Sequence, residues 1–301
     1  MPITAAKPED SWKLRCLLMG DPKTAKTPLA AAASQVYGKM LYFALDPDSD
    51  SLPSVPASWW PNIQVIRSAP APGQPWDPTA ELMELANHDW KSKYPDAEIM
   101  VFDSLSHRME EILQHIANQN FFSNQKGEDK HVTIGPVGGK GTFNIPVMGD
   151  YMGAKGVAER FYTLVARQPM HLIIVTHIEV DDKSKDPSGI KAGPALVGKA
   201  LVRDFPRHFG AVLRTEKKTI STEKGPQLML QVHTEGDSFW IGGVRHQPAA
   251  DGSMKNPIPV VQIPNDTPDR MVGFWKLFNK TFVPQYKGQT ALVPAANTKE
   301  S

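Results

Sequence analysis

The segment that constrains this chain most is an apolar run that passes directly into a short loop and then into an alanine-rich stretch. It spans Leu17–Thr27 and reads LLMGDPKTAKT. A strand, a loop and a helix in this order are the context of a phosphate-binding loop, whose usual pattern is G-x-x-x-x-G-K-[ST]. Gly20, Lys26 and Thr27 match that pattern. We therefore predict that the loop cradles phosphates, with the lysine on the outer phosphates and the threonine hydroxyl on magnesium.

Ala25 departs from the pattern, because it replaces the glycine that directly precedes the lysine. Its methyl group can crowd the phosphate or strain the turn, so that nucleotide binding either survives with lower affinity or fails. An ordinary strand-to-helix turn is the alternative. Lys23 is an additional cation that either compensates or faces water. The residues predicted to contact the nucleotide are Gly20, Asp21, Pro22, Lys23, Thr24, Ala25, Lys26 and Thr27.

A later stretch, Glu98–Phe102, is mostly apolar and is followed by an acid, Asp103. A phosphate loop followed by such an acid is the two-part pattern of a magnesium-nucleotide site. Asp103 is predicted to stand at the carboxyl end of a strand, where open α/β sheets bind their ligands. Thr27 and Asp103 are therefore the predicted magnesium residues, with Asp103 acting through water. Capping of the helix that begins at Leu105 is an alternative role, compatible with the first.

Short apolar runs alternate with helical stretches, which is typical of a mainly parallel sheet covered by helices. The predicted strands are 14–19, 40–45, 63–66, 98–102 and 171–176, with edge hairpin strands at 211–215, 227–233 and 239–245. The predicted helices are 27–37, 79–93, 105–118, 151–166 and 268–282. The sequence thus predicts an α/β fold with antiparallel strands at one edge. Its predicted parts are an N-terminal tail (1–11), a nucleotide-binding core (12–247), an extension with an amphipathic helix (248–284) and a polar tail (285–301).

The composition narrows the class of protein. The 33 Lys and Arg residues face 32 Asp and Glu residues, so any attraction to nucleic acid must come from local patches. The single cysteine, Cys16, excludes a disulfide framework and is expected to be buried. Neither a secretory signal nor a long apolar run is visible, which indicates a soluble cytoplasmic protein without membrane contact.

Five stretches together resemble the RecA-like ATPases encoded by phages, including the group with single-strand annealing activity. The likeness runs from Trp12 to Arg245 and rests on Gly20–Thr27, Val101–Leu105, Leu172–His177, Gly193–Leu201 and Phe209–Leu213. The resemblance implies a RecA-like core, ATP and Mg²⁺ as cofactors, and single-stranded DNA as a partner. It also implies a ring or filament of several copies, a single-strand-binding protein as a second partner, and the host cytoplasm as the location.

The same resemblance implies roles for individual residues. An acid after the second strand polarises the attacking water, which assigns this role to Asp48, with Asp46 as second choice; a turn rich in Asp and Pro is the alternative. His177 is assigned the sensing of the γ-phosphate, with capping of its strand as the alternative. A neighbouring copy supplies a cation to the phosphates. The candidate cations are Arg214, Lys217, Lys218 and Arg245. Of these, Lys217 and Arg245 are predicted to be catalytic.

Two loops, 122–150 and 178–196, take the positions of the RecA DNA-binding loops under this resemblance. Lysines in or beside them can neutralise DNA phosphates, and aromatic side chains can stack on bases. Solvated surface loops are the alternative, because Asp181, Asp182 and Asp186 lower the net charge. The predicted DNA-binding residues are Lys126, Lys130, Lys140, Phe143, Lys183, Lys185, Lys191 and Lys199, with Phe122 and Tyr151 as further stacking candidates.

Three functions are compatible with these features. The first is an ATP-binding protein that binds single-stranded DNA and promotes recombination or annealing. The second is a non-hydrolysing P-loop scaffold in which Ala25 has removed turnover, and the third is a helicase-type motor or its loader. The helix at 268–282 either packs on the core or docks a partner.

Overall fold

A computed structural model gives the structure of the chain. It describes residues 13–46, 52–67, 76–123, 133–134, 143–180, 192–197, 199–223, 225–236, 241–244, 256, 258–264 and 267–282. Within these ranges, no helix is long and apolar enough to cross a membrane.

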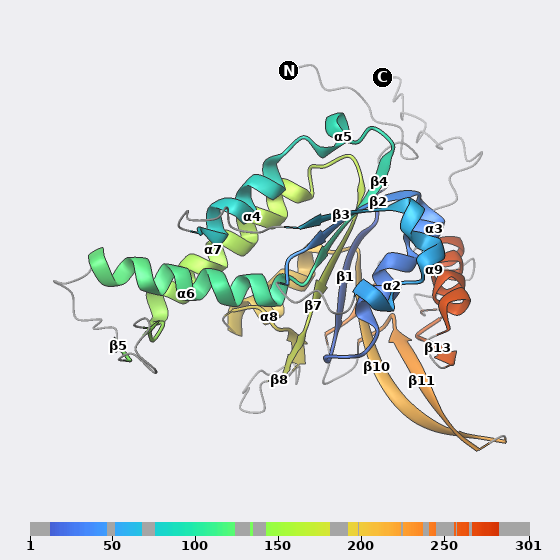
Figure 1. The fold of residues 1–301 in the computed structure, drawn as a ribbon. Coiled ribbons are helices and arrows are strands. Elements are labelled where there is room, and N and C mark those ends of the chain that lie inside the picture. The colour runs from blue at the N-terminus through green and yellow to red at the C-terminus, as the bar shows by residue number, and fades with distance from the viewer. Residues whose placement is uncertain are drawn as a thin grey trace, which may run out of the picture.

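A central sheet organises the described residues (Figure 1). Its strand order is β13-β11-β10-β1-β7-β4-β2-β3, with β12 paired to β10. The six strands from β10 to β3 are parallel, whereas β11, β12 and β13 pair in antiparallel fashion. The strands are β1 (Arg15–Gly20), β2 (Lys39–Ala44), β3 (Ile63–Arg67), β4 (Ala97–Asp103), β7 (His171–Thr176), β10 (Ala211–Thr222), β11 (Gly225–His233), β12 (Gly243–Val244) and β13 (Val260–Pro264). The predicted α/β fold class, with antiparallel strands at one edge, is confirmed.

Helices cover both faces of the sheet (Figure 1). One face packs against α2 (Lys26–Ala32), α3 (Ser34–Tyr37), α9 (Pro268–Phe282) and the short 3-10 helices η1 (Leu52–Ser54) and η2 (Ala57–Asn62). The other packs against α4 (Pro78–Asn87), α5 (Trp90–Lys93), α6 (Leu105–Ser123), α7 (Met148–Val165), α8 (Lys199–Asp204) and η4 (Phe205–His208). Two small hairpins, β5 (Thr133–Ile134) with β6 (Phe143–Asn144) and β8 (Ile178–Val180) with β9 (Ala192–Pro194), lie outside the sheet.

Two predicted helices are each divided in the structure. The helix predicted for 27–37 is α2 followed by α3, and it ends where expected, at Gly38 with a φ of 104°. The helix predicted for 79–93 is α4 followed by α5, because His88 adopts an extended conformation between them. The new start at α5 is capped by the Asp89 side chain, which accepts from the Ser92 amide at 3.1 Å. Apolar periodicity predicted both segments but not the interruptions.

The strand predicted for 211–215 differs in its pairing from the prediction. We expected an edge hairpin strand, whereas the first part of β10 pairs in parallel with β1, from Cys16↔Ala211 to Gly20↔Thr215. On its other side β10 pairs in antiparallel fashion, with β12 at Ala211 and Val212 and with β11 from Arg214 onward, where it forms a long hairpin. The buried run Ala211–Thr215 explains this, because it is covered on both sides like the central strands.

The terminal helix α9 packs on the core, which was the first of its two predicted roles. Met271, Phe274, Trp275 and Phe278 are all buried. The Trp275 Nε1 atom donates a hydrogen bond of 2.7 Å to the carbonyl oxygen of Leu29 in α2. Helix α9 is thereby attached to the helix that follows the predicted phosphate loop. The predicted boundary after residue 247 stays a prediction.

Candidate functional site

The carboxyl ends of four neighbouring parallel strands, β1, β2, β4 and β7, meet at one cavity. This is the edge at which open α/β sheets bind ligands. The cavity has a volume of about 520 Å³, within the usual range for small-molecule sites. It is lined by Pro22, Lys23, Thr24, Ala25, Lys26, Thr27, Pro28, Asp46, Ser54, Pro56, Asp103, Ser104, His177, Lys217, Pro268 and Met271.

The loop between β1 and α2 has the conformation of a tight turn closed on itself. Thr24 Oγ1 donates to the Asp21 carbonyl at 2.7 Å and lies 2.9 Å from Thr215 Oγ1 on β10. A Cβ atom on Gly20 would come within 2.2 Å of Thr215 Oγ1 and 2.7 Å of the Thr215 backbone oxygen. Only glycine therefore fits at the start of this loop.

Ala25 stands in the left-handed region of the backbone map, with φ 57° and ψ 29°. Glycine adopts this region at no steric cost, whereas an L-residue with a Cβ atom pays about 1–2 kcal/mol. The strain anticipated at Ala25 is thus present in the backbone. The loop nevertheless keeps the turn that glycine usually makes.

Replacing Ala25 by glycine is expected to stabilise the protein by about 0.5–1 kcal/mol, because the relief of left-handed strain outweighs the larger entropy of an unfolded glycine. Urea denaturation of the two proteins measures this difference. Ala31, a buried residue inside α2, provides the control, because Ala31→Gly should lower stability by about 1 kcal/mol. A loss of stability in both variants would contradict a strained Ala25.

The Lys26 side chain turns back over the loop and ends in the cavity. Its Nζ atom donates to the carbonyl oxygens of Gly20 at 2.8 Å and Asp21 at 2.7 Å, and lies 3.5 Å from His177 Nδ1. Burial lowers the pKa of Lys26 to about 8, although the nearby carboxylates of Asp103, Asp21 and Asp46 favour the charged form. A buried ammonium group without a full counter-charge is suited to a polyanion.

The two predicted magnesium residues lie in contact. Thr27 Oγ1 donates to Asp103 Oδ2 at 2.5 Å, and the Tyr42 hydroxyl donates a short hydrogen bond to the same oxygen. Burial raises the pKa of the Asp103 carboxyl, and the two hydroxyl donors partly offset this effect. The distance between the loop and the acid is therefore short enough for both to reach one cation.

Asp46, His177 and Lys217 complete the polar wall of the cavity. Asp46 Oδ1 accepts a hydrogen bond of 3.1 Å from Ser104 Oγ. The His177 backbone amide donates to Ser106 Oγ at 2.9 Å, and burial followed by the Lys26 charge lowers the pKa of the imidazole. Lys217 lines the cavity of its own chain, whereas the resemblance implied a cation from a neighbouring copy.

Several predicted residues cannot be placed. Asp48, Lys126, Lys130, Lys140, Lys183, Lys185, Lys191 and Arg245 lie outside the described residues. The structure places Phe122, Phe143 and Lys199 on α6, β6 and α8 without describing their side chains. Tyr151 is half-buried on α7. The assignment of Asp48 and Arg245 to catalysis and of these loops to DNA stays a prediction.

Sequence reasoning missed several contributors to the site. Tyr42 and Thr215 lie inside apolar strands, and their polar ends gave no local signal. Pro56, Pro268 and Met271 come from segments far from the phosphate loop in sequence, and they form part of the cavity wall. The alternation of side chains along β2 predicts that Tyr42 lies on the same face of the sheet as Ala44. It does not predict that the Tyr42 hydroxyl contacts Asp103.

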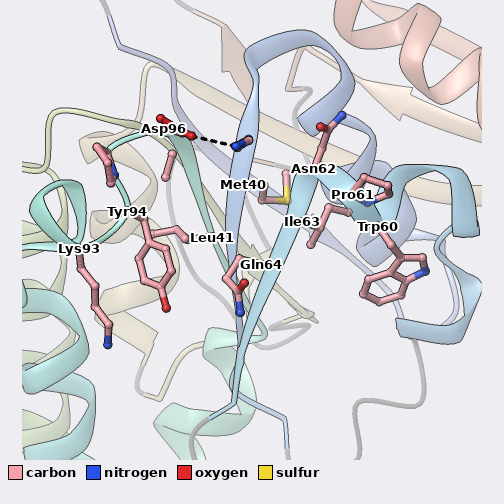
Figure 2. Close-up of a pocket in the computed structure, with 13 residues that line it drawn as sticks. Met40, Leu41, Trp60, Pro61, Asn62, Ile63, Gln64, Lys93, Tyr94 and Asp96 are labelled. Atoms are coloured by element: carbon pink, nitrogen blue, oxygen red, sulfur yellow. Dashed lines mark hydrogen bonds and ion pairs between the residues drawn. The ribbon is translucent and has the colours of Figure 1, made fainter.

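A second hollow lies at the other end of the parallel strands, beside the amino ends of β2, β3 and β4 (Figure 2). It has a volume of about 370 Å³, and none of the described residues that line it belongs to the predicted site. Figure 2 shows Tyr94 and Trp60 beside it. Lys39 and Asp96, which also line the hollow, form an ion pair of 2.9 Å. Both partners of that pair are largely exposed, so it contributes little to stability.

Comparisons with known proteins give a distant likeness in fold. The chain can be superposed on the crystal structure of the RadB recombinase with a TM-score of 0.35 and 11% sequence identity, covering 73% of this chain and 79% of that one. No family model matches the chain, and no curated protein matches it. The interpretation of the cavity therefore rests on its own geometry.

Proposed function

We propose that this chain is a RecA-like protein that binds ATP with Mg²⁺, binds single-stranded DNA, and promotes annealing or recombination in phage DNA metabolism. The observation that carries the proposal is the convergence of Lys26, Thr27 and Asp103 at one cavity. These three groups are a cation for the phosphates, a hydroxyl for the metal and a carboxylate for its water shell.

The residues at the cavity fit a magnesium nucleotide. Magnesium in proteins is typically held by one or two carboxylates together with substrate phosphates. Asp103 supplies the carboxylate, and the Thr27 hydroxyl that now donates to it can turn to a metal ion. The Lys26 ammonium group, held by two carbonyl oxygens of the loop, can exchange these acceptors for phosphate oxygens. When bound, the metal would neutralise phosphate charge.

The DNA-binding part of the proposal is supported by the connection at His177. Hairpin β8–β9 begins directly after this residue, and the Ala195 amide donates to the His177 carbonyl at 2.8 Å. A shift of His177 toward or away from a phosphate would therefore move both ends of the hairpin. The sequence between β8 and β9 contains Lys183, Lys185 and Lys191, which could neutralise DNA phosphates.

The deciding experiment measures ATP·Mg²⁺ binding and the binding of a labelled oligothymidine at several salt concentrations, with and without ATP. We expect ATP to tighten DNA binding by about fivefold or more, the usual lower range of coupling between two sites. DNA binding should weaken as salt rises. Absence of ATP binding overturns the proposal. DNA binding that ignores ATP would instead indicate annealing on a passive surface.

Ala25 gives specific support to a second function, a non-hydrolysing scaffold. Its strained backbone and added methyl group lie where the phosphates would pass. A protein of this kind would bind ATP and assemble copies of itself without turnover. ATP hydrolysis that is absent in the native chain and appears in Ala25→Gly would favour the scaffold, whereas DNA-stimulated hydrolysis in the native chain would exclude it.

A further inference from the structure

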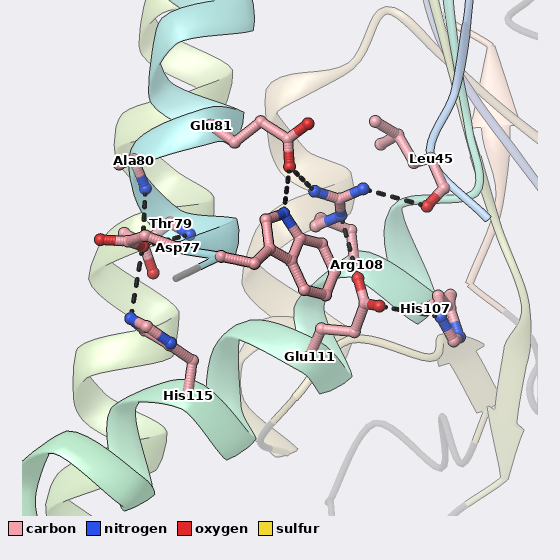
Figure 3. A network of polar contacts seen from close by, with 10 residues as sticks. Leu45, Asp77, Thr79, Ala80, Glu81, His107, Arg108, Glu111 and His115 are labelled. Atoms are coloured by element: carbon pink, nitrogen blue, oxygen red, sulfur yellow. Dashed lines mark hydrogen bonds and ion pairs between the residues drawn. The ribbon is translucent and has the colours of Figure 1, made fainter. Parts of the chain in front are cut away.

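A buried arginine on α6, Arg108, contacts a carboxylate on α4, a carboxylate on its own helix and the backbone that follows β2 (Figure 3). Arg108 is 2% exposed. Its NH1 atom lies 2.5 Å from Glu81 Oε2 on α4, and its Nε atom lies 3.1 Å from Glu111 Oε2 one turn further along α6. Its guanidinium group also stacks over the Trp76 ring at 5.0 Å, and Trp76 Nε1 donates to the same Glu81 oxygen at 2.8 Å. The guanidinium plane is therefore fixed from several sides.

The second terminal nitrogen of Arg108, NH2, points at the backbone rather than at an acid. NH2 donates a hydrogen bond of 3.2 Å to the carbonyl oxygen of Leu45, as Figure 3 shows. The amide of the same residue donates to the Asp103 carbonyl at 2.7 Å. The peptide groups on both sides of Leu45 are thus held, one from α6 and one from β4. The next residue is Asp46, whose carboxylate borders the nucleotide cavity.

A buried ion network of this kind is an inefficient source of stability. Desolvation of the charges offsets most of their attraction, and apolar replacements of similar volume are often at least as stable. What such a network supplies is a fixed geometry, because the planar fork of arginine accepts few alternative arrangements. The geometry that is fixed here is that of the backbone leading into Asp46.

We infer that Arg108 is a positioning residue for the nucleotide site, which sets the place of the Asp46 carboxylate through the Leu45 backbone. The inference rests on the proposed function, because Asp46 acts on a nucleotide only if the cavity binds one. It assigns a role in phosphate chemistry to α6 and α4, although none of their described side chains lines the cavity. It also makes Asp46 the acid through which this role is exerted.

Arg108→Lys tests the inference against a matched control, Arg15→Lys. Arg15 is also forked onto backbone oxygens, with contacts of 2.6 Å to Met170 and 2.8 Å to Ala166. It stands at the start of β1, away from the cavity. We expect Arg108→Lys to lower kcat for ATP about tenfold with little change in KM, because displacement of a reacting group by about 1 Å can cost up to a hundredfold. Arg15→Lys should leave both constants unchanged and lower only the melting temperature.

Two further measurements separate positioning from a general structural effect. In an Asp46→Ala background, Arg108→Lys should cause no additional loss of kcat, since residues acting through one another are not additive. In the nucleotide-free protein, hydrogen exchange at the Leu45 amide should be about tenfold faster in Arg108→Lys, equivalent to about 1.4 kcal/mol, and unchanged in Arg15→Lys.

The outcomes distinguish this inference from the proposed function. A native protein that binds no ATP overturns both. If the native protein binds ATP, then unchanged exchange at Leu45, or an equal loss of kcat with and without Asp46, overturns only the role of Arg108. If the native chain binds ATP without turnover, the exchange measurement alone decides.

Discussion

Replacing Trp275 by alanine is expected to lower the free energy of unfolding by about 3–5 kcal/mol, the usual cost of removing a buried tryptophan. Trp275 is completely buried, contacts the rings of Tyr37, Phe274 and Phe278, and donates its indole hydrogen to Leu29. The substitution therefore leaves a cavity between α9 and the helix of the phosphate loop and removes a buried hydrogen bond to the Leu29 carbonyl. Equilibrium urea denaturation followed by far-ultraviolet circular dichroism measures the loss.

The conservative variant Trp275→Phe separates the two contributions. It keeps most of the apolar volume but removes the hydrogen bond to a buried acceptor, which costs about 1–3 kcal/mol. Lys276, the exposed neighbour on α9, is the control, and Lys276→Ala should change stability by less than about 0.5 kcal/mol. A loss below about 1 kcal/mol for Trp275→Ala would mean that α9 is not attached to α2 as described. Met271 lies one turn before Trp275 on α9 and borders the cavity, so Trp275→Ala should also weaken ATP binding.

The sequence was sufficient to locate the centre of the site. A strand, a loop and a helix around Lys26, and an acid ending a later strand, predict groups at one sheet edge, because parallel strands present their carboxyl ends together. Thr27 and Asp103 could therefore be paired across 76 positions of sequence. These two predictions needed only local pattern and the direction of the strands. The assignment of His177 came instead from the resemblance to RecA-like ATPases, and its Nδ1 atom lies 3.5 Å from Lys26 Nζ.

The sequence was insufficient wherever the partner is set by packing. Arg108 shows this clearly. It occupies a polar position on an amphipathic helix and would be expected on the surface, as most arginines are. Its burial depends on Glu81 and Trp76, which come from α4 and the residues just before it, and on the Leu45 carbonyl, which follows β2. Likewise, the period of α9 predicted an apolar face but not that this face closes over α2 and borders the cavity.

Replacing Lys26 by alanine is expected to weaken ATP binding by about 10- to 150-fold, equivalent to the 1.5–3 kcal/mol of a hydrogen bond between charged groups. Titration calorimetry with ATP and Mg²⁺ measures this. The free energy of unfolding should not fall, because the alanine variant avoids the desolvation of a buried ammonium group. Lys23→Ala is the matched control, since Lys23 is an exposed cation of the same loop. Equal losses in both variants would indicate a general attraction between a cationic loop and ATP.

The acidity of Lys26 adds a pH dependence that a general attraction would lack. Only the protonated ammonium group attracts phosphate, and burial lowers its pKa to about 8 in the absence of nucleotide. Bound phosphate favours the charged form, so binding above pH 8 must take up a proton. The dissociation constant for ATP should therefore rise as pH increases through 8, by up to about tenfold per pH unit, until the pKa of the complex is reached. His177 does not produce this slope, because its pKa is lowered from 6.5 and the imidazole is already neutral there. Lys26→Ala should remove the slope, and a slope that persists in this variant would assign the proton to another group.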